Sequence, residues 1–425
     1  MEIGLDPDGN LAWFENLTPR GIKLGLDNMK ELLERLGNPQ DGIRFVHVAG
    51  TDGKGSVCAM IEAILVASGI RTGAFTSPHI MKVNECLRLD GEEIPDADLL
   101  NTISIVRPHA EAMEAEGHVC TSFEVLTALA MVYFKTVSVE IAVLEVGMGG
   151  RMDSTNVITP EVSVINNIGL EHVQYLGGSI EEIAYEKAGI MKSGVPCVTI
   201  NNGPALEVIM KRSEEIGAPL TQVSDSEIEV VSSRPDALEI IYHGELFEIA
   251  LPGRHQAGNA ALAIAAVSML PEYTDIIAPH VVEGLSRISW PCRMQKMIAM
   301  PIVIDVTHTL AGARCLQNDI GEIYHKVVLV LGMLNDKDID GVSRELAPIA
   351  EKVFITAPRS PRAESPEVVA EFMSKYHQDV TVVPTVAEAM DMAMECRGDL
   401  NILATGSFRM AEDVLKWLQD RYARS

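Results

Sequence analysis

Short runs of apolar, often β-branched residues alternate along the chain with longer segments of helical period. Residues 45–49, 72–75, 140–146, 162–168 and 195–200 are predicted to be buried strands because nearly every position in them is apolar. Apolar residues recur at helical spacing in four further segments, which are residues 28–36, 56–65, 122–135 (with Ser122 as a candidate cap) and 180–191. Strands of continuous Val and Ile between helices indicate a mainly parallel α/β sheet covered on both faces.

The pattern changes at residues 227–250, where three short alternating runs separated by turn residues predict an antiparallel meander at one edge of the sheet. A helix over residues 257–270 follows. A second alternation begins at Pro301, with strands expected at residues 302–305, 327–331, 352–356, 379–383 and 401–404. We therefore predict a first α/β domain over residues 1–294 that includes the meander, and a smaller Rossmann-like α/β domain over residues 295–425.

The composition and net charge of the chain disfavour some classes of binding partner. The chain has 425 residues, of which 47% are hydrophobic and 22% charged, as in ordinary globular proteins. Its formal charge of −26 argues against binding to nucleic acid or to an anionic membrane surface. An ordinary solvated surface accounts for this charge. A site for a nucleotide triphosphate would need local Lys, Arg and Mg²⁺ to overcome the repulsion.

The cysteine pattern and the absence of long apolar runs indicate in which cellular compartment the protein resides. The seven cysteines include no C-x-x-C pair, which is typical of reduced thiols rather than of a disulfide framework. The first residues lack an apolar core of the signal-peptide kind, and no apolar run approaches the roughly 20 residues that span a bilayer. We expect a cytoplasmic protein, soluble and monomeric, that acts on small molecules.

The most informative stretch follows the first predicted strand. Glycines and one lysine connect that strand to a helix, in the order Gly50, Thr51, Asp52, Gly53, Lys54, Gly55 and Ser56. In such a loop, backbone N–H groups and a helix N-terminus face a phosphate, the lysine adds a charge and the hydroxyl can reach Mg²⁺. The spacing is shorter than G-x-x-x-x-G-K-[ST]. A glycine-rich turn with an incidental lysine is the alternative, and the flanking strand and helix disfavour it.

Three further residues are candidates for chemistry. Glu145 ends a buried strand and precedes a glycine-rich turn, so it would face the phosphate loop and could bind the same Mg²⁺. His172 follows the strand at 162–168, and Lys187 lies in a predicted helix. From the residues alone, such a histidine is usually a loop residue with its own partners, and such a lysine is usually a solvated charge.

Ordered motifs along the chain resemble those of the folylpolyglutamate and dihydrofolate synthases, which belong to the Mur ligase superfamily. The phosphate loop resembles their Gly-Thr-Asn-Gly-Lys-Gly-Ser, and residues 145–156 match Glu-Val-Gly-x-Gly-Gly-Arg-x-Asp-x-Thr-Asn. Further matches are residues 76–79, 168–172, 186–190, 251–259, 290–293, 332–338 and 405–407.

The resemblance implies a role for each matching residue. Glu145 and His172 would hold Mg²⁺ together with Ser56 and Ser77, and Lys187 would be carbamylated and serve a second metal ion. Asn259 would meet the nucleotide base. Arg293 would reach an ATP phosphate, and Asp305 and His308 would help to form the site where ATP and the amino acid meet. We count Lys54, Lys187, His172 and His308 as the candidate catalytic residues.

The implied function is ATP- and Mg²⁺-dependent amide formation between the two domains. A pterin-linked acid (dihydropteroate or a folate) would be activated as an acyl phosphate and joined to L-glutamate. A ligase of the same architecture that uses another acid or pterin cofactor is the first alternative. The second is a nucleotide-binding regulator without catalysis, against which the retention of Glu145, His172 and Lys187 argues.

Three positions depart from the family pattern. Asp52 stands where the phosphate loop usually has Asn, Cys86 stands where an Asn-Glu-Arg motif has Arg, and residues 305–310 lack the Asn and Pro of Asp-Gly-Ala-His-Asn-Pro. In particular, Thr309 offers one hydroxyl where Asn offers both a donor and an acceptor. These departures leave the ATP chemistry in place and leave open the identity of the acid.

Overall fold

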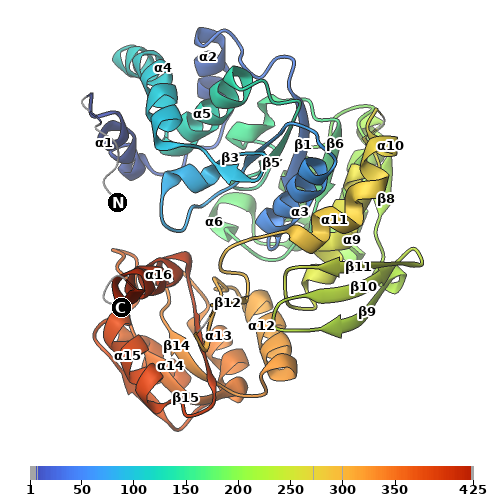
Figure 1. Ribbon diagram of the computed structural model, residues 1–425. Helices are drawn as coiled ribbons and strands as arrows, with labels where there is room; N and C mark the ends of the chain where they lie inside the picture. Colours follow the sequence, from blue (N-terminus) through green and yellow to red (C-terminus); the bar gives the residue numbers. More distant parts are fainter. Residues whose placement is uncertain (1–5, 7, 271, 299, 423–425) are drawn as a thin grey trace. The chain divides into compact units, whose positions relative to one another are not determined.

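A computed structural model of the chain describes residues 6, 8–270, 272–298 and 300–422 (Figure 1). The chain forms two compact units, which we treat separately. The first comprises residues 1–227 and 258–287, and the second comprises residues 228–257 and 288–425. The meander, which we expected within the first domain, therefore groups with the second unit. The boundary after residue 294 stays a prediction.

The first unit is built on an eight-stranded sheet in the order β4-β3-β2-β5-β1-β6-β7-β8. All neighbours from β2 to β8 pair in parallel, and β3 and β4 extend one edge in antiparallel fashion. The strands are β1 (Arg44–Ala49), β2 (Thr72–Phe75), β3 (Leu87–Leu89), β4 (Glu92–Glu93), β5 (Ile141–Glu145), β6 (Val162–Ile165), β7 (Cys197–Thr199) and β8 (Leu220–Gln222). The mainly parallel sheet is as predicted.

Helices surround this sheet, and Figure 1 shows α3 beside β1. Their apolar faces form a core with the inner strands, in which Phe45, Leu129 and Phe134 are buried. The helices are α1 (Asn10–Glu15), α2 (Asp27–Arg35), α3 (Lys54–Ala67), α4 (Asp96–Ala115), α5 (Ser122–Thr136), α6 (Val173–Leu176), α7 (Ile180–Ala188), α8 (Gly203–Ile216), α9 (Gln256–Val267), α10 (Thr274–Ile277) and α11 (Val281–Arg287). Of these, α9 begins in the second unit and continues into the first.

The second unit contains a six-stranded sheet in the order β12-β13-β17-β14-β15-β16, parallel except for the edge strand β12. The strands are β12 (Gln295–Lys296), β13 (Ile302–Ile304), β14 (Val327–Leu331), β15 (Ala350–Ile355), β16 (Val380–Val382) and β17 (Asn401–Thr405). The helices are α12 (Leu310–Ile323), α13 (Ile339–Leu346), α14 (Pro366–Met373), α15 (Val386–Cys396) and α16 (Phe408–Tyr422). Each of the five predicted strands of this domain is present.

The antiparallel meander is confirmed, but its predicted place at an edge of the first sheet is wrong, because it forms a separate sheet of β9 (Ile228–Ser233), β10 (Leu238–Tyr242) and β11 (Glu245–Ile249). Alternate residues of β10 are buried, as the sequence pattern requires. The segment after β11 is hydrogen-bonded to α12. The Asp319 carboxylate accepts a hydrogen bond from the backbone N–H of Arg254 (2.7 Å) and lies 2.8 Å from Nδ1 of His255.

Several local predictions were wrong, among them the helix over residues 180–191, which ends at Ala188, and the strand over residues 195–200, which spans Cys197–Thr199. The cap of α5 is Thr121, not Ser122, because the Thr121 hydroxyl accepts from the Glu124 N–H and the Glu124 carboxylate accepts from the Thr121 N–H. Strand β6 ends at Ile165 rather than at residue 168, because Asn167 and Gly169 bond to Thr51 of the phosphate loop instead of continuing the strand pairing.

No helix in the described parts of the chain combines the length and the apolar composition that a lipid bilayer requires.

Candidate active site

The phosphate loop connects β1 to α3, and its glycines have backbone conformations that other residues rarely adopt. Gly50 has a φ of 152° and Gly53 a φ of 78°. A Cβ on Gly53 would also lie 2.7 Å from the side chains of both Asn166 and Asn259. Glycine is required at Gly53 for both reasons. The turn brings the backbone N–H groups at the start of α3 to the carboxyl edge of the sheet.

Residues that follow β6 hold this loop in place. The Thr51 N–H donates to the Asn167 carbonyl (2.7 Å), and the Gly169 N–H donates to the Thr51 hydroxyl (3.0 Å). The Asn166 amide donates both to the Asp52 carbonyl (3.0 Å) and to Oδ1 of Asn259 (2.8 Å). Asn259 is therefore beside the phosphate loop, although its predicted contact with a nucleotide base is untested.

The cation and the hydroxyl of the loop lie in the first turn of α3. Nζ of Lys54 donates to the Thr51 carbonyl at 3.0 Å, which folds the lysine back over its own loop. Ser56 is buried, with 1% of its surface exposed. The N–H of Asp52, the residue that departs from the family pattern, donates to the Asn167 side chain (3.0 Å).

Lys187 lies in the last turn of α7 and is 2% exposed. Its Nζ donates to the Gly50 carbonyl of the phosphate loop. Burial and the neighbouring Lys54 lower the pKa of Lys187 to about 7, against the opposing influence of nearby carboxylates, the first of which is Glu171. A helical lysine is usually solvated, so the residue pattern alone gave no sign of this environment.

His172 and Glu171 form a pair at the start of α6. Nε2 of His172 lies 3.2 Å from Oε1 of Glu171. Burial favours the neutral form of Glu171, but the hydrogen bond to His172 and the charges of Lys54 and Lys187 outweigh it and lower its pKa to about 2. We predicted His172 and missed Glu171, although Glu171 belongs to the Ile168–His172 motif that we had matched.

Glu145 is the last residue of β5 and faces the loop that carries Ser77. Its Oε2 accepts a hydrogen bond from the Ser77 N–H at 3.1 Å, which brings together two of the predicted metal ligands. Glu85 holds the rest of this loop, because its carboxylate accepts from the N–H groups of Ile80 (2.6 Å), Met81 (2.7 Å) and Lys82 (2.8 Å).

Cys86, the second departure from the family pattern, lies directly after Glu85. The residue is 1% exposed, and burial raises the pKa of its thiol above the usual range. Its Sγ lies 3.9 Å from Nδ1 of His79. A buried neutral thiol therefore stands where the family motif places a cation, close to the Ser77 loop.

The described residues contain no group of three or more His, Cys, Asp or Glu side chains arranged to hold a metal ion. Glu145, Ser77 and Ser56 provide one carboxylate and two hydroxyls, which suits Mg²⁺ when it is bound through few protein oxygens, with phosphate and water completing its shell. In its ammonium form Lys187 does not fit a metal site, because that group is a cation without a lone pair.

Of the predicted residues of the second unit, Asp305 and His308 follow β13 at its carboxyl end, and Arg293 precedes β12. Asp305 accepts from the N–H groups of Met294 (2.9 Å) and Thr307 (2.7 Å), and His308 holds the Val306 carbonyl through Nδ1 at 2.9 Å. Arg293 lies over the Phe408 ring, 5.4 Å from its centroid. The Thr309 hydroxyl caps α12 by accepting from the Gly312 N–H at 3.0 Å.

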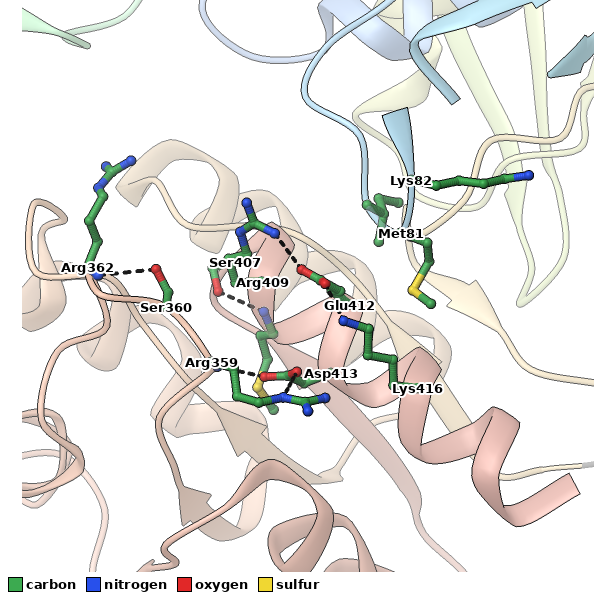
Figure 2. Close-up of polar contacts among 12 residues, drawn as sticks. Met81, Lys82, Arg359, Ser360, Arg362, Ser407, Arg409, Glu412, Asp413 and Lys416 are labelled. Atoms are coloured by element: carbon green, nitrogen blue, oxygen red, sulfur yellow. Dashed lines mark hydrogen bonds and ion pairs between the residues drawn. The ribbon is translucent and has the colours of Figure 1, made fainter. Parts of the chain in front are cut away.

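Figure 2 shows basic residues of the second unit that we had not singled out. The buried carboxylate of Asp413 accepts from the N–H of Arg359 and from its Nε, both at 2.7 Å. Arg409 and Lys416 both reach Glu412. Arg409, Glu412 and Lys416 are neighbours at helical spacing within α16, whereas the fold brings Arg359 to Asp413 from 54 residues away.

Comparison with known proteins identifies both parts of the chain. Residues 48–267 match the Mur ligase middle domain, and residues 292–408 match the Mur ligase glutamate ligase domain. A dihydrofolate synthase/folylpolyglutamate synthase of Bacillus subtilis is 34% identical over 96% of this chain and 98% of its own length. A probable bifunctional folylpolyglutamate synthase/dihydropteroate synthase of Haloferax volcanii is 34% identical over 93% of this chain, which spans only 49% of that protein.

Solved structures give the same result. The crystal structures of Mycobacterium tuberculosis folylpolyglutamate synthase complexed with ADP and AMPPCP include a chain that is 32% identical, with a TM-score of 0.87. The match covers 96% of this chain and 98% of that one. The likeness therefore extends over nearly the whole of both chains, in sequence as well as in fold.

Proposed function

Because this chain belongs to the folylpolyglutamate and dihydrofolate synthase family of Mur ligases, we propose that it is an ATP-dependent amide ligase. Its acid substrate is a pterin-linked carboxylate, either dihydropteroate or a folate, and its amine is L-glutamate. The products are the amide, ADP and phosphate. Cytoplasmic location and a monomeric state stay predictions, as do the roles of Asn259, Arg293, Asp305 and His308.

One observation supports this proposal above the others: a buried lysine is bonded to the phosphate loop itself. A glycine-rich loop with Lys54 suits any enzyme that uses nucleotide triphosphates. Lys187 adds a second amine whose Nζ donates to the Gly50 carbonyl inside that loop. The amines of Lys54 and Lys187 and the carboxylates of Glu145 and Glu171 therefore lie at the carboxyl edge of the sheet. Ligands of open α/β sheets bind at this edge.

The ATP phosphates suit the loop because backbone N–H groups and Lys54 offset their charge locally. This local charge matters in a protein with a net charge of −26, which repels anions at a distance. The bonds from Asn166, Asn167 and Gly169 fix the loop before the nucleotide arrives. Less conformational freedom is then lost on binding.

Ser56, Ser77 and Glu145 are the residues that would hold Mg²⁺. When bound, Mg²⁺ supplies charge neutralisation and orientation of phosphate oxygens. The Ser77 N–H holds Oε2 of Glu145 at 3.1 Å, so the carboxylate is oriented in advance. His172 would complete this set, with Glu171 orienting its ring through Nε2.

Carbamylation would make Lys187 an oxygen ligand for a second metal ion. The neutral amine attacks CO₂, a nitrogen–carbon bond forms and one proton is released, which leaves a carbamate anion. A pKa of about 7 means that a large fraction of the amine is neutral near pH 7. The carbamate nitrogen retains one N–H, which can still donate to the Gly50 carbonyl.

The reaction then proceeds in two transfers. The substrate carboxylate oxygen attacks the γ-phosphorus of ATP, and the bond to the β-γ bridging oxygen breaks to release ADP. The glutamate amine attacks the carbonyl of the acyl phosphate, loses a proton and expels phosphate. Lys54 and the oriented backbone N–H groups act by stabilising charge on the phosphoryl oxygens rather than by covalent chemistry.

The test is phosphate release from ATP with dihydropteroate or tetrahydrofolate as the acid and each amino acid in turn. We expect release that depends on glutamate with at least one pterin acid. Release with another acid or amine, and none with glutamate and either pterin, would replace the folate assignment with another substrate of the same fold. ATP turnover with any acid and amine would exclude a regulator without catalysis.

A further inference from the structure

A buried histidine of the first sheet has no part in the reaction described above. His47 lies in β1, which carries the phosphate loop at its end, and none of its surface is exposed. Burial, followed by the nearby charge of Lys192, lowers the pKa of His47 to about 3, so the ring is neutral at physiological pH. A buried imidazole requires hydrogen-bond partners, because an unpaired polar group in the core is destabilising.

The partners of His47 form a chain of hydrogen bonds with a defined direction. The Asp153 carboxylate accepts from the Thr155 hydroxyl (2.5 Å), the Thr155 N–H (3.0 Å) and the Met148 N–H (2.9 Å). Burial raises the pKa of Asp153, but its N–H and O–H donors favour the ionised form, which can only accept. The Thr155 proton therefore points to Asp153, and its oxygen is left to accept from Nε2 of His47 at 2.8 Å. His47 must then carry its proton on Nε2. Its Nδ1 is buried with no hydrogen-bond partner among the described residues.

Asp153, the last member of this series of hydrogen bonds, holds the turn that follows Glu145. The Met148 N–H, which Asp153 accepts, lies three residues after Glu145 in that turn. The turn has no room to shift toward the neighbouring helix, because a Cβ on Gly147 would lie 2.5 Å from the Phe123 ring. Asp153 thus fixes the backbone directly beyond the carboxylate that faces Ser77.

The same turn lies against the end of α7 that carries Lys187. The Arg151 N–H donates to the Glu186 carbonyl at 2.8 Å, and a Cβ on Gly150 would lie 3.1 Å from the Lys187 carbonyl oxygen. The amide of Asn156, the residue after Thr155, donates to the Gly189 carbonyl at 3.1 Å. The backbone on both sides of Lys187 therefore rests on the segment that Asp153 and Thr155 hold.

From these contacts we infer that His47, Thr155 and Asp153 form a positioning relay for Glu145 and Lys187. The relay starts at His47 in β1, the strand that precedes the phosphate loop. Its three side chains fix the backbone of residues 146–156, and this segment in turn positions Glu145 and Lys187. None of the three contacts the reacting atoms, so they are positioning residues. Their effect on turnover rests on the proposed function, whereas the hydrogen-bond direction does not.

The first experiment compares Thr155→Val with Thr155→Ser in the full chain. Valine has the shape of threonine and removes the hydroxyl, whereas serine retains it. We expect Thr155→Val to lower kcat by about tenfold to a hundredfold, the usual effect of removing a residue that orients a ligand, with the KM for ATP nearly unchanged. Thr155→Ser should retain most of kcat. Full kcat in the valine variant, or equal losses in both variants, would overturn the relay.

The second experiment needs no variant and no activity. Side-chain ¹⁵N chemical shifts of the wild-type protein report which ring nitrogen of His47 carries the proton. We expect the Nε2–H tautomer, and a proton on Nδ1 would overturn the relay even if Thr155→Val does not fold. If the wild-type protein ligates nothing, the proposed function fails alone, and the tautomer still decides whether the relay exists.

Discussion

Each of the two parallel sheets has charged residues beyond the carboxyl ends of its strands. The two sites differ in how far these side chains are buried. In the first unit Lys187 is 2% exposed, and its pKa is lowered to about 7. In the second unit the side chain of Arg359 is 73% exposed although it is paired with the buried Asp413. A perturbed, buried amine is typical of a reaction site, whereas a solvated arginine is typical of a surface that meets a charged ligand.

Both edges contain hydrogen bonds between distant segments, but those of the phosphate loop span more of the chain. In the second unit the Thr309 hydroxyl caps α12 through a bond that spans three residues, the Arg359–Asp413 bond spans 54 and the Ser407–Gly332 bond spans 75. In the first unit the bond from Lys187 to Gly50 spans 137 residues, and that from Asn166 to Asp52 spans 114. The first edge also holds the buried amine, and we therefore propose that the residues of the reaction lie there.

The largest effect is expected for Lys54→Ala. Removing a cation that stabilises phosphoryl charge should lower kcat by about a hundredfold to a thousandfold while the chain stays folded. Lys135→Ala is the matched control, because Lys135 likewise donates to one backbone carbonyl, that of Asp41, at 2.7 Å. Steady-state kinetics and thermal melting measure both variants. A folded Lys54→Ala variant with the wild-type rate would remove the phosphate-loop assignment.

Lys187→Met should be nearly inactive for a different reason, the loss of the carbamate. A small carboxylate in the buffer should restore part of the rate by occupying its place. The intact mass of the wild-type protein, measured with and without bicarbonate, tests the modification directly. An active protein with an unmodified Lys187 would contradict the carbamate.

The same variant has a predicted pH signature in CO₂-free buffer. The pKa of Lys187 is lowered from 10.5 to about 7 on folding, so between these values the unfolded chain binds a proton that the folded chain has released. The free energy of unfolding contributed by this group therefore rises with pH across that window. Lys187→Met should flatten the rise, as measured by chemical denaturation. An unchanged slope would mean that Lys187 is solvated.

Glu85→Gln tests the loop of Ser77 and should have a smaller effect. Glutamine would present an NH₂ group where the carboxylate accepts from three backbone N–H groups, so the loop should loosen. We expect kcat to fall by about tenfold to a hundredfold. Glu93→Gln is the control, since it breaks only the exposed pair with Lys82. Equal kcat in both variants would argue against a role for the loop.

The smallest effect is expected in the second unit, for Thr309→Asn. Asn caps helices as well as Thr does, so α12 should keep its stability. One added hydrogen bond to a charged substrate group should lower the KM for glutamate or ATP by up to about tenfold. Kinetics with each substrate varied in turn provide the measurement. If neither KM changes, Thr309 serves only as the helix cap.

The sequence by itself determined the features that depend on neighbours along the chain. Continuous apolar runs marked the inner strands, alternation marked the meander, and glycines between β1 and α3 marked the phosphate loop. These patterns are local, because periodicity and backbone freedom are properties of a few adjacent residues. Helix α4 (Asp96–Ala115) was not predicted. Pro108 lies within it, and a proline inside a helical segment weakens the local pattern from which a helix is predicted.

Only the tertiary structure decided the environments of the side chains. Lys187 and Lys54 both lie in helices, yet one is buried against Gly50 and the other bends back to Thr51. Likewise, His47 gave no signal of its own within a strand of apolar neighbours. The physical reason is that desolvation and hydrogen-bond direction depend on groups that folding brings from distant segments.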